Sequence, residues 1–268
     1  MNTILNKDFL FQIEAIVLQA GEIVRSADLS HATIHEKSSA NDLVTSYDVA
    51  VQEFLQGKLK ALLPESDFLG EETDLHALDP ARPTWIVDPI DGTTNFIKGY
   101  GQSAISVALA QGGASIAGVV YNPFTKELFS AYQGGGAFLN GKPIHADMAP
   151  LEQNIALFGS APYQKNQLAD VTFGLLRSVF EVSMDIRRSG SAALDVCFLA
   201  AGRAGVYFEY RVCPWDYAAG MIIAQEAGAK VTDLAGQPMT LDCITTICVA
   251  PPENHKRVLE MAQKVGIR

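Results

Sequence analysis

Two stretches near the N-terminus repeat apolar residues at spacings of three and four, which is the pattern of one face of an amphipathic helix. The first set is Leu10, Ile13, Ile16, Val17, Ala20, Ile23 and Val24, and the second is Val51, Phe54, Leu55, Leu59 and Leu62. Thr45, Ser46 and Asp48 precede the second set and are candidate helix caps. The pattern therefore predicts two amphipathic helices before residue 65.

The middle of the chain changes to short runs of β-branched and aromatic residues, which favour strands. These runs are Thr84–Asp88, Ala104–Ala110, Ser115–Tyr121 and Glu127–Tyr132, with Asn122-Pro123, Gly134-Gly135-Gly136 and Asn140-Gly141 as turn signals. Pro89 disfavours helix at Asp88 and cannot donate to a ladder, so we expect the first run to end there. The stretch predicts a largely antiparallel meander.

The second half of the chain alternates helix and strand patterns. Helices are predicted over 191–201, 216–226 and about 252–265, with Gly228 ending the second, and strands over 204–209 and 245–250. The halves meet near residues 146–152, where no linker composition marks a joint. We therefore expect two packed halves, residues 1–147 and 148–268, that share a cleft.

Composition narrows the class of protein. The 268 residues are 48% hydrophobic, which predicts a globular chain, and the net charge of −10 argues against a nucleic-acid-binding face. Such a chain must hold an anionic substrate by local means, such as helix N-termini, a few cations or metal ions. Four cysteines without a Cys-x-x-Cys pair, and no signal peptide or membrane-length apolar run, favour a cytoplasmic protein with no membrane contact.

The segment Trp85–Phe96 carries the most informative chemistry. An apolar run leads into Asp88 and Asp91, and Gly92, Thr93 and Thr94 follow at once. Two carboxylates on either side of a turn can converge, and they repel each other unless a proton, a cation or a metal ion lies between them. Oxygen ligands without histidine or cysteine suggest Mg²⁺, Mn²⁺ or Ca²⁺. The alternative is that both aspartates only make turn and cap hydrogen bonds.

Four further segments are ambiguous when each is taken alone. Glu71-Glu72 follows a short apolar piece and would usually be a solvated pair, and Asp216 is placed to cap a helix. The small residues after Arg187-Arg188 could present backbone N–H groups to an anion, or simply begin a helix. The polar stretch 37–48 is either a functional loop or a capped helix start.

In this order, the segments resemble the inositol monophosphatase family over nearly the whole chain. Trp85–Phe96 looks like the first metal-binding signature, Trp215-Asp216-x-Ala-Ala-Gly looks like the second, and Gly70-Glu71-Glu72 lies upstream of both. The resemblance implies an α/β fold of the α+β type. This would be a layered α/β/α/β/α sandwich with a largely antiparallel N-terminal sheet and a mixed C-terminal half. It also implies a Mg²⁺-dependent, lithium-sensitive phosphatase that is commonly a homodimer.

The resemblance further assigns roles by position. The metal ligands would be Glu71, Asp88, Asp91, Asp216 and the carbonyl of Ile90, holding two or three Mg²⁺, with Mn²⁺ as a possible substitute. Glu71 and Thr93 would orient the attacking water, and Asp48 would hydrogen-bond Thr93. The substrate contacts would be Asp91, Gly92, Thr93, Gly190, Ser191, Ala192, Glu209 and Asp216, of which Gly190, Ser191, Ala192 and Glu209 face the alcohol. The stretch 37–48 resembles a mobile loop of the family.

The resulting hypothesis is a phosphomonoesterase that acts on inositol monophosphate. A related bisphosphatase, acting on fructose 1,6-bisphosphate or 3′-phosphoadenosine 5′-phosphate, is the second reading. A regulatory protein or RNA-binding partner is the third. Arg211 is expected at the surface, with contact to a second phosphate as the alternative. The five histidines lie outside every motif and are expected to be surface or structural residues.

Overall fold

A computed structural model describes residues 5–28, 34–36, 43–73, 75 and 77–266. Residues 37–42, most of the predicted loop before the second helix, lie outside the described residues. The helices are α1 (Lys7–Arg25), α2 (Ser46–Leu62), α3 (Thr93–Ile97), α4 (Lys165–Phe180), α5 (Ala192–Ala200), α6 (Pro214–Glu226) and α7 (Pro252–Lys264). Two 3₁₀ turns, η1 (Leu151–Gln153) and η2 (Pro162–Gln164), precede α4 in the sequence.

The first sheet has seven strands in the order β3-β4-β5-β6-β7-β8-β9. They are β3 (Asp67–Gly70), β4 (Thr84–Asp91), β5 (Ala104–Gln111), β6 (Ala114–Asn122), β7 (Glu127–Tyr132), β8 (Gly136–Leu139) and β9 (Lys142–Ile144). Only β3 and β4 pair in parallel, with Asp67 opposite Thr84, so the predicted antiparallel meander is confirmed from β4 onward. The short strands β1 (Ile34–Glu36) and β2 (Leu43–Thr45) form a separate antiparallel pair.

The second sheet has five strands in the order β11-β10-β12-β14-β13. They are β10 (Ile155–Phe158), β11 (Asp185–Arg187), β12 (Val206–Val212), β13 (Lys230–Thr232) and β14 (Thr245–Ala250). β10 is parallel to β11 and β12, whereas β14 is antiparallel to β12 and β13. The C-terminal sheet is therefore mixed, as expected.

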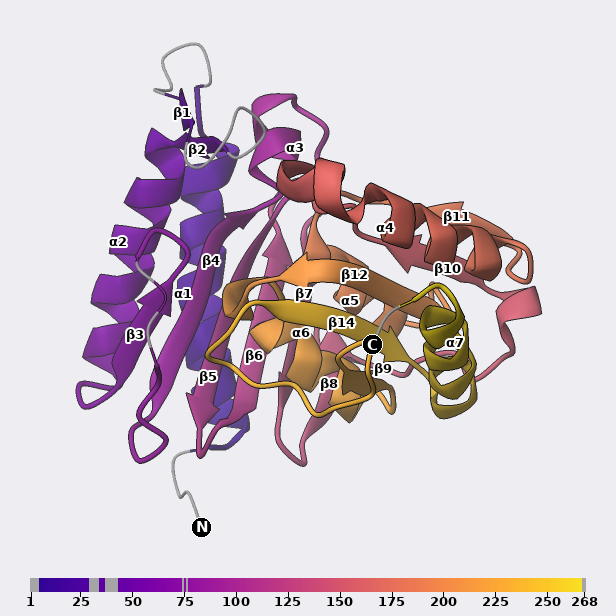
Figure 1. Cartoon of the computed structure of the whole chain (residues 1–268). Helices are drawn as coiled ribbons and strands as arrows, with labels where there is room; N and C mark the ends of the chain where they lie inside the picture. The colour runs from indigo at the N-terminus through magenta and orange to yellow at the C-terminus, as the bar shows by residue number, and fades with distance from the viewer. Residues whose placement is uncertain (1–4, 29–33, 37–42, 74, 76, 267–268) are drawn as a thin grey trace.

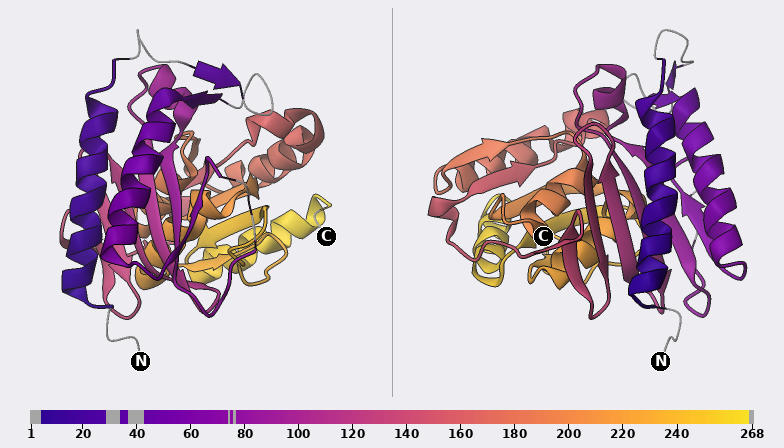
Figure 2. Two further views of the ribbon diagram at one scale, coloured as in Figure 1. Left: turned by 90° about the vertical axis from the view of Figure 1, so that its left-hand side faces the viewer. Right: turned by 180° about the vertical axis from the view of Figure 1, so that it is seen from behind.

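The elements stack in five layers (Figure 1). The helices α1 and α2 lie side by side on the outer face of the first sheet (Figure 2), and their apolar stripes form one core with it. The helices α5 and α6 lie between the two sheets, and α4 and α7 cover the outer face of the second sheet. The predicted α/β/α/β/α sandwich is confirmed. The division at residues 147 and 148 stays a prediction.

Three local predictions need correction. β4 does not end at Asp88, because it continues through Pro89 to Asp91 with a shift of register between the two aspartates. An irregular step in a ladder leaves one residue unpaired and so tolerates proline. Asp216 is not the cap of α6; it is the third residue of the helix and accepts from the N–H of the cap residue Cys213, at 2.7 Å. The helix α4 was not predicted.

Several predicted ends are confirmed. Thr45 caps α2, and its side chain accepts from the backbone N–H groups of Tyr47 and Asp48. Gly228, with φ of +94°, follows the end of α6. No described helix is both long and apolar enough to cross a membrane. All four cysteines are free thiols.

Candidate functional site

Asp88 and Asp91 come to one point because β4 carries both through its irregular step. Both side chains are buried, with exposed fractions of 2% and 9%. One Asp88 carboxylate oxygen accepts from the backbone N–H of Ile90 at 3.0 Å, which fixes the turn between the two aspartates. The turn-forming role considered as the alternative is thus present. One such bond leaves most of the acceptor capacity of the Asp88 carboxylate for another partner.

Two more acidic side chains join them from other elements. Glu71 directly follows β3, and its N–H donates to the carbonyl of Val87 at 3.0 Å, so the parallel pairing brings it beside Asp88. Asp216 arrives from the first turn of α6. Burial and the charges of Glu71, Asp91 and Asp216 raise the pKa of Asp88 well above its ordinary value. We call Glu71, Asp88, Asp91 and Asp216 the carboxylate cluster.

Asp91 differs from its neighbours because a helix of the second half donates to it. The N–H of Ala193 donates to the Asp91 carboxylate at 2.7 Å, and the hydroxyl of Ser191 donates to the same oxygen. Burial still raises the pKa of Asp91 to about 6, although both donors oppose the rise. At the start of α5, the N–H of Ala193 therefore binds the chain's own Asp91 carboxylate. This is the kind of contact between a backbone N–H and an anion that the sequence analysis considered for this segment.

Gly92 and Thr93 begin the short helix α3 directly after Asp91. Gly92 has φ of +85°, and a β-carbon there would lie 2.9 Å from the carbonyl oxygen of Gln102 and 3.1 Å from that of Gly190. Only glycine therefore fits this turn without strain. The Thr93 hydroxyl lies 3.1 Å from the Ile90 carbonyl and 3.3 Å from an Asp48 carboxylate oxygen, so either can accept its proton.

Asp48 is held by its own helix start. It is 1% exposed and accepts from both the N–H of Thr45, at 2.8 Å, and the Thr45 hydroxyl. Burial raises the pKa of Asp48 to about 6 despite these bonds. The structure therefore brings Asp48, Thr93 and the Ile90 carbonyl together, as the sequence analysis expected. Their catalytic roles remain predictions.

Glu209, on β12, has both carboxylate oxygens engaged. Tyr207 donates its hydroxyl to one oxygen at 2.7 Å, and the backbone N–H of Ala161 donates to the other at 3.1 Å. Any β-carbon at Gly159 would lie 1.9 Å from this carboxylate. Glu209 thus fastens the segment that carries Tyr163 to the second sheet, in addition to its predicted place near the alcohol.

The segment 188–191 is fastened to α3 by a residue that sequence reasoning missed. The Asn95 amide donates to the carbonyl of Ser189 at 2.9 Å and to that of Gln102 at 2.6 Å. This contact holds Gly190, with φ of +87°, opposite Gly92. Asn95 follows Thr93-Thr94 directly in the sequence, so its place inside the motif was the only signal for it.

Asp195, Tyr163 and Arg188 were also missed as site residues. Asp195 is 2% exposed, and its Oδ1 makes no hydrogen bond. Burial and the nearby charges of Glu209 and Asp91 raise its pKa well above the ordinary value. Tyr163 and Arg188 lie beside Glu209 and Gly190 and are described below. These contacts join segments far apart in sequence, which local patterns do not reveal.

The donor chemistry fits a divalent metal ion of the hard class. Beside burial, the charges of Glu71 and Asp91 raise the pKa of both Asp88 and Asp216, and bound cations relieve such repulsion. Within the described residues, no three or more His, Cys, Asp or Glu side chains stand in a finished metal-binding arrangement. A cavity of about 260 Å³ between the halves is lined by Thr84 and Leu241. It lies toward the opposite end of β4 from Asp91 and is therefore separate from the carboxylate cluster.

The five-layer fold places a cluster of carboxylates beside Thr93, a set of oxygen donors that suits hard divalent metal ions. The model of the inositol monophosphatase family matches residues 6–266, and the chain belongs to that family, whose members are generally metal-dependent. It is a phosphomonoesterase.

Named relatives and a solved structure agree with this assignment. Nus factor SuhB of Vibrio cholerae is 35% identical over 254 residues, covering 95% of each chain. Inositol monophosphatase 3 of Solanum lycopersicum is 38% identical over 230 residues, covering 83% of this chain and 85% of the relative. The crystal structure of extragenic suppressor protein suhB from Bartonella henselae has a TM-score of 0.89 and 30% identity, and it covers 97% of this chain and 100% of that one.

Proposed function

We propose that this protein is a Mg²⁺-dependent phosphatase that hydrolyses inositol monophosphate to inositol and phosphate. The observation that supports it most is the convergence of Glu71, Asp91 and Asp216 on the buried Asp88, whose pKa burial and these three charges raise together. Glu71, Asp88, Asp91, Asp216 and the Ile90 carbonyl would hold two or three ions. Bound Mg²⁺ would neutralise charge on the phosphate and lower the pKa of a coordinated water.

The chain's own groups then have separable tasks. Glu71 and Thr93 would orient the attacking water, and Asp48 would hold the Thr93 hydroxyl, which lies 3.3 Å from its carboxylate. The backbone at Gly92 and Thr93 would contact the phosphate, since the glycine leaves room for close approach. Gly190, Ser191, Ala192 and Glu209 would face the alcohol, where Ser191 also fixes Asp91.

Phosphate release from a substrate panel tests this proposal. The panel is inositol 1-phosphate, fructose 1,6-bisphosphate, 3′-phosphoadenosine 5′-phosphate, 2′-AMP and glycerol 2-phosphate, each with Mg²⁺ and with EDTA. We expect Mg²⁺-dependent release that is fastest with inositol 1-phosphate and absent with EDTA. Preference for fructose 1,6-bisphosphate or 3′-phosphoadenosine 5′-phosphate would keep the reaction and replace inositol as the alcohol. Release that is unchanged in EDTA would contradict the metal-dependent mechanism.

The regulatory alternative has one observation in its favour, namely that a 35%-identical relative is named a Nus factor. Against it stand the intact carboxylate cluster and the net charge of −10, which weakens binding to RNA. A gel shift with RNA, with and without Mg²⁺, separates the readings. We expect no specific shift. Light scattering coupled to gel filtration tests the homodimer that we propose from the family resemblance.

A further inference from the structure

Arg188 lies directly beside the residues expected to contact substrate. A β-carbon placed on Gly190 would be 3.4 Å from Nη1 of Arg188, so this guanidinium folds back over the start of the segment 190–192. The Asn95 amide holds the same segment against α3. Arg188 is therefore attached to the segment that faces Gly92, although its side chain is exposed to solvent.

Arg211 approaches from β12 and is oriented by an aromatic ring. Its guanidinium carbon lies 5.6 Å from the centre of the Tyr163 ring, which is a cation–π contact. The Tyr163 side chain belongs to the turn η2, which the bond from Ala161 to Glu209 fastens in place. Partial burial of the Tyr163 side chain, which is 41% exposed, and the charges of Asp216, Glu209, Asp91 and Glu71 raise its pKa, so the phenol stays protonated.

The two guanidiniums act on the same carboxylate without pairing with it. The charges of Arg188 and Arg211 both oppose the rise that burial produces in the pKa of Glu209. Neither arginine takes part in the ion pairs that described side chains form. Both oxygens of Glu209 already accept hydrogen bonds. Two cations therefore face one engaged carboxylate, in a chain whose net charge is −10.

We propose that Arg188 and Arg211 form a binding site for a second anionic group on the alcohol portion of the substrate. Tyr163 holds Arg211 there. The proposal rests on the phosphatase function proposed above and extends its substrate class from monophosphates to phosphate esters with a further phosphate or carboxylate. A guanidinium presents several N–H groups in one plane, a geometry that matches such groups.

Two substrates with the same ring test the proposal, namely inositol 1-phosphate and inositol 1,4-bisphosphate at saturating Mg²⁺. We expect the native protein to show at least ~10-fold higher kcat/KM for the bisphosphate, mainly through KM. R188Q together with R211Q should remove this advantage, so that kcat/KM for the two substrates becomes equal within about 2-fold. Raising KCl from 50 to 300 mM should shrink the advantage of the native protein, since both groups are partly exposed.

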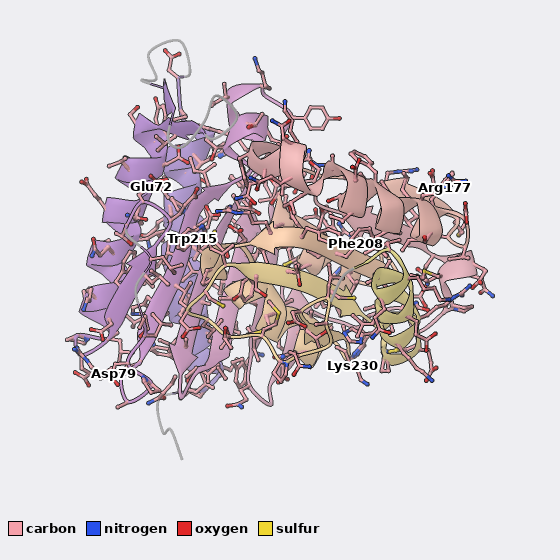
Figure 3. All side chains as sticks on the ribbon, viewed as in Figure 1. Glu72, Asp79, Arg177, Phe208, Trp215 and Lys230 are labelled. Atoms are coloured by element: carbon pink, nitrogen blue, oxygen red, sulfur yellow. The ribbon has the colours of Figure 1, made fainter. Side chains whose placement is uncertain are left out.

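R177Q is the matched control, because Arg177 lies on the outer helix α4 far from the junction of the halves and pairs with Glu181 (Figure 3). It should keep the full preference. The Y163F variant should keep most of it, whereas Y163A should lose it through the freed Arg211. Equal or better use of the monophosphate by the native protein would overturn the proposal, as would equal losses on both substrates in the double variant. No Mg²⁺-dependent release from either substrate would instead contradict the phosphatase function itself.

Discussion

The two halves of the molecule contribute opposite kinds of groups to the site. The first half supplies Glu71, which follows β3, and Asp88 and Asp91 on β4, and burial raises the pKa of both aspartates. The second half supplies mainly hydrogen-bond donors and cations, namely the start of α5 and the two guanidiniums, besides Asp216. The difference is visible along one strand. Asp88 accepts from a backbone N–H of its own strand and lies beside the Glu71 side chain, whereas Asp91 is held by α5 across the junction. The reaction chemistry and the substrate selection that we propose therefore depend mainly on different segments.

The largest expected effect comes from removing one negative charge from the carboxylate cluster. Asp88→Asn should lower the rate of phosphate release by at least ~10³, because the other three members of the cluster all act on this carboxylate. The measurement is turnover at saturating Mg²⁺. Asp67→Asn, a change on the next strand at an exposed ion pair with Arg82, is the control and should remain active. Near-normal turnover of Asp88→Asn would remove this residue from the metal site.

The next variant separates metal binding from the orientation of the attacking water. Thr93→Ala should lower kcat by about 10², because the hydroxyl between Asp48 and the Ile90 carbonyl is lost while every carboxylate stays. The Mg²⁺ concentration at half activity should change little. Thr94→Ala alters an exposed neighbour and should have no effect. A collapse of Mg²⁺ affinity in Thr93→Ala would make Thr93 structural.

A third change acts on the junction between the halves. Gly92→Ala should lower the free energy of unfolding by at least ~2 kcal/mol, because the new methyl meets the carbonyls of Gln102 and Gly190 at a positive φ. Gly99→Ala shares the positive φ but meets no atom within 4 Å, so it isolates the backbone cost. Denaturant unfolding of both variants measures the difference. Equal losses would show that the contact across the junction contributes nothing.

The smallest expected effect is a dependence of stability on pH in metal-free protein. Burial raises the folded-state pKa of Asp48 to about 6 from an ordinary value of 3.8, so between these values the folded state binds more protons. Stability is then greatest at low pH and falls as pH rises through 6. Between pH 5 and 7 this group should cost about 1 kcal/mol. Asp48→Asn should flatten that part of the curve, and a parallel curve would assign the effect elsewhere.

Much of this arrangement could be predicted from the sequence, and the rest has identifiable physical reasons for being missed. Apolar periodicity predicted α1 and α2, because their stripes pack on one sheet face. The motif around Asp88 and Asp91 correctly predicted that these two carboxylates lie close together. Pro89 misled the assignment of the strand end, because the register shift that accommodates it depends on the pairing with β5.

The second half was harder to predict. The helix α4 does carry an apolar stripe, so its sequence could have predicted it and it was overlooked. The stripe consists of Leu168, Val171, Leu175, Leu176 and Val179. The sequence could not predict that Arg188 lies beside Gly190 or that Arg211 lies on the Tyr163 ring. It depends on the bonds from Asn95 to Ser189 and from Ala161 to Glu209, each of which joins residues more than 40 positions apart.

The central helical layer has a consequence for how the protein unfolds. One continuous core contains Ile86 and Phe129 of the first sheet, Tyr207 and Val249 of the second, and most of α5 and α6 between them. Neither sheet can lose these helices without exposing an apolar face to water. We therefore expect a single cooperative heat-absorption peak. A fragment that stops before α5 should aggregate rather than fold, which makes the two halves parts of one folding unit.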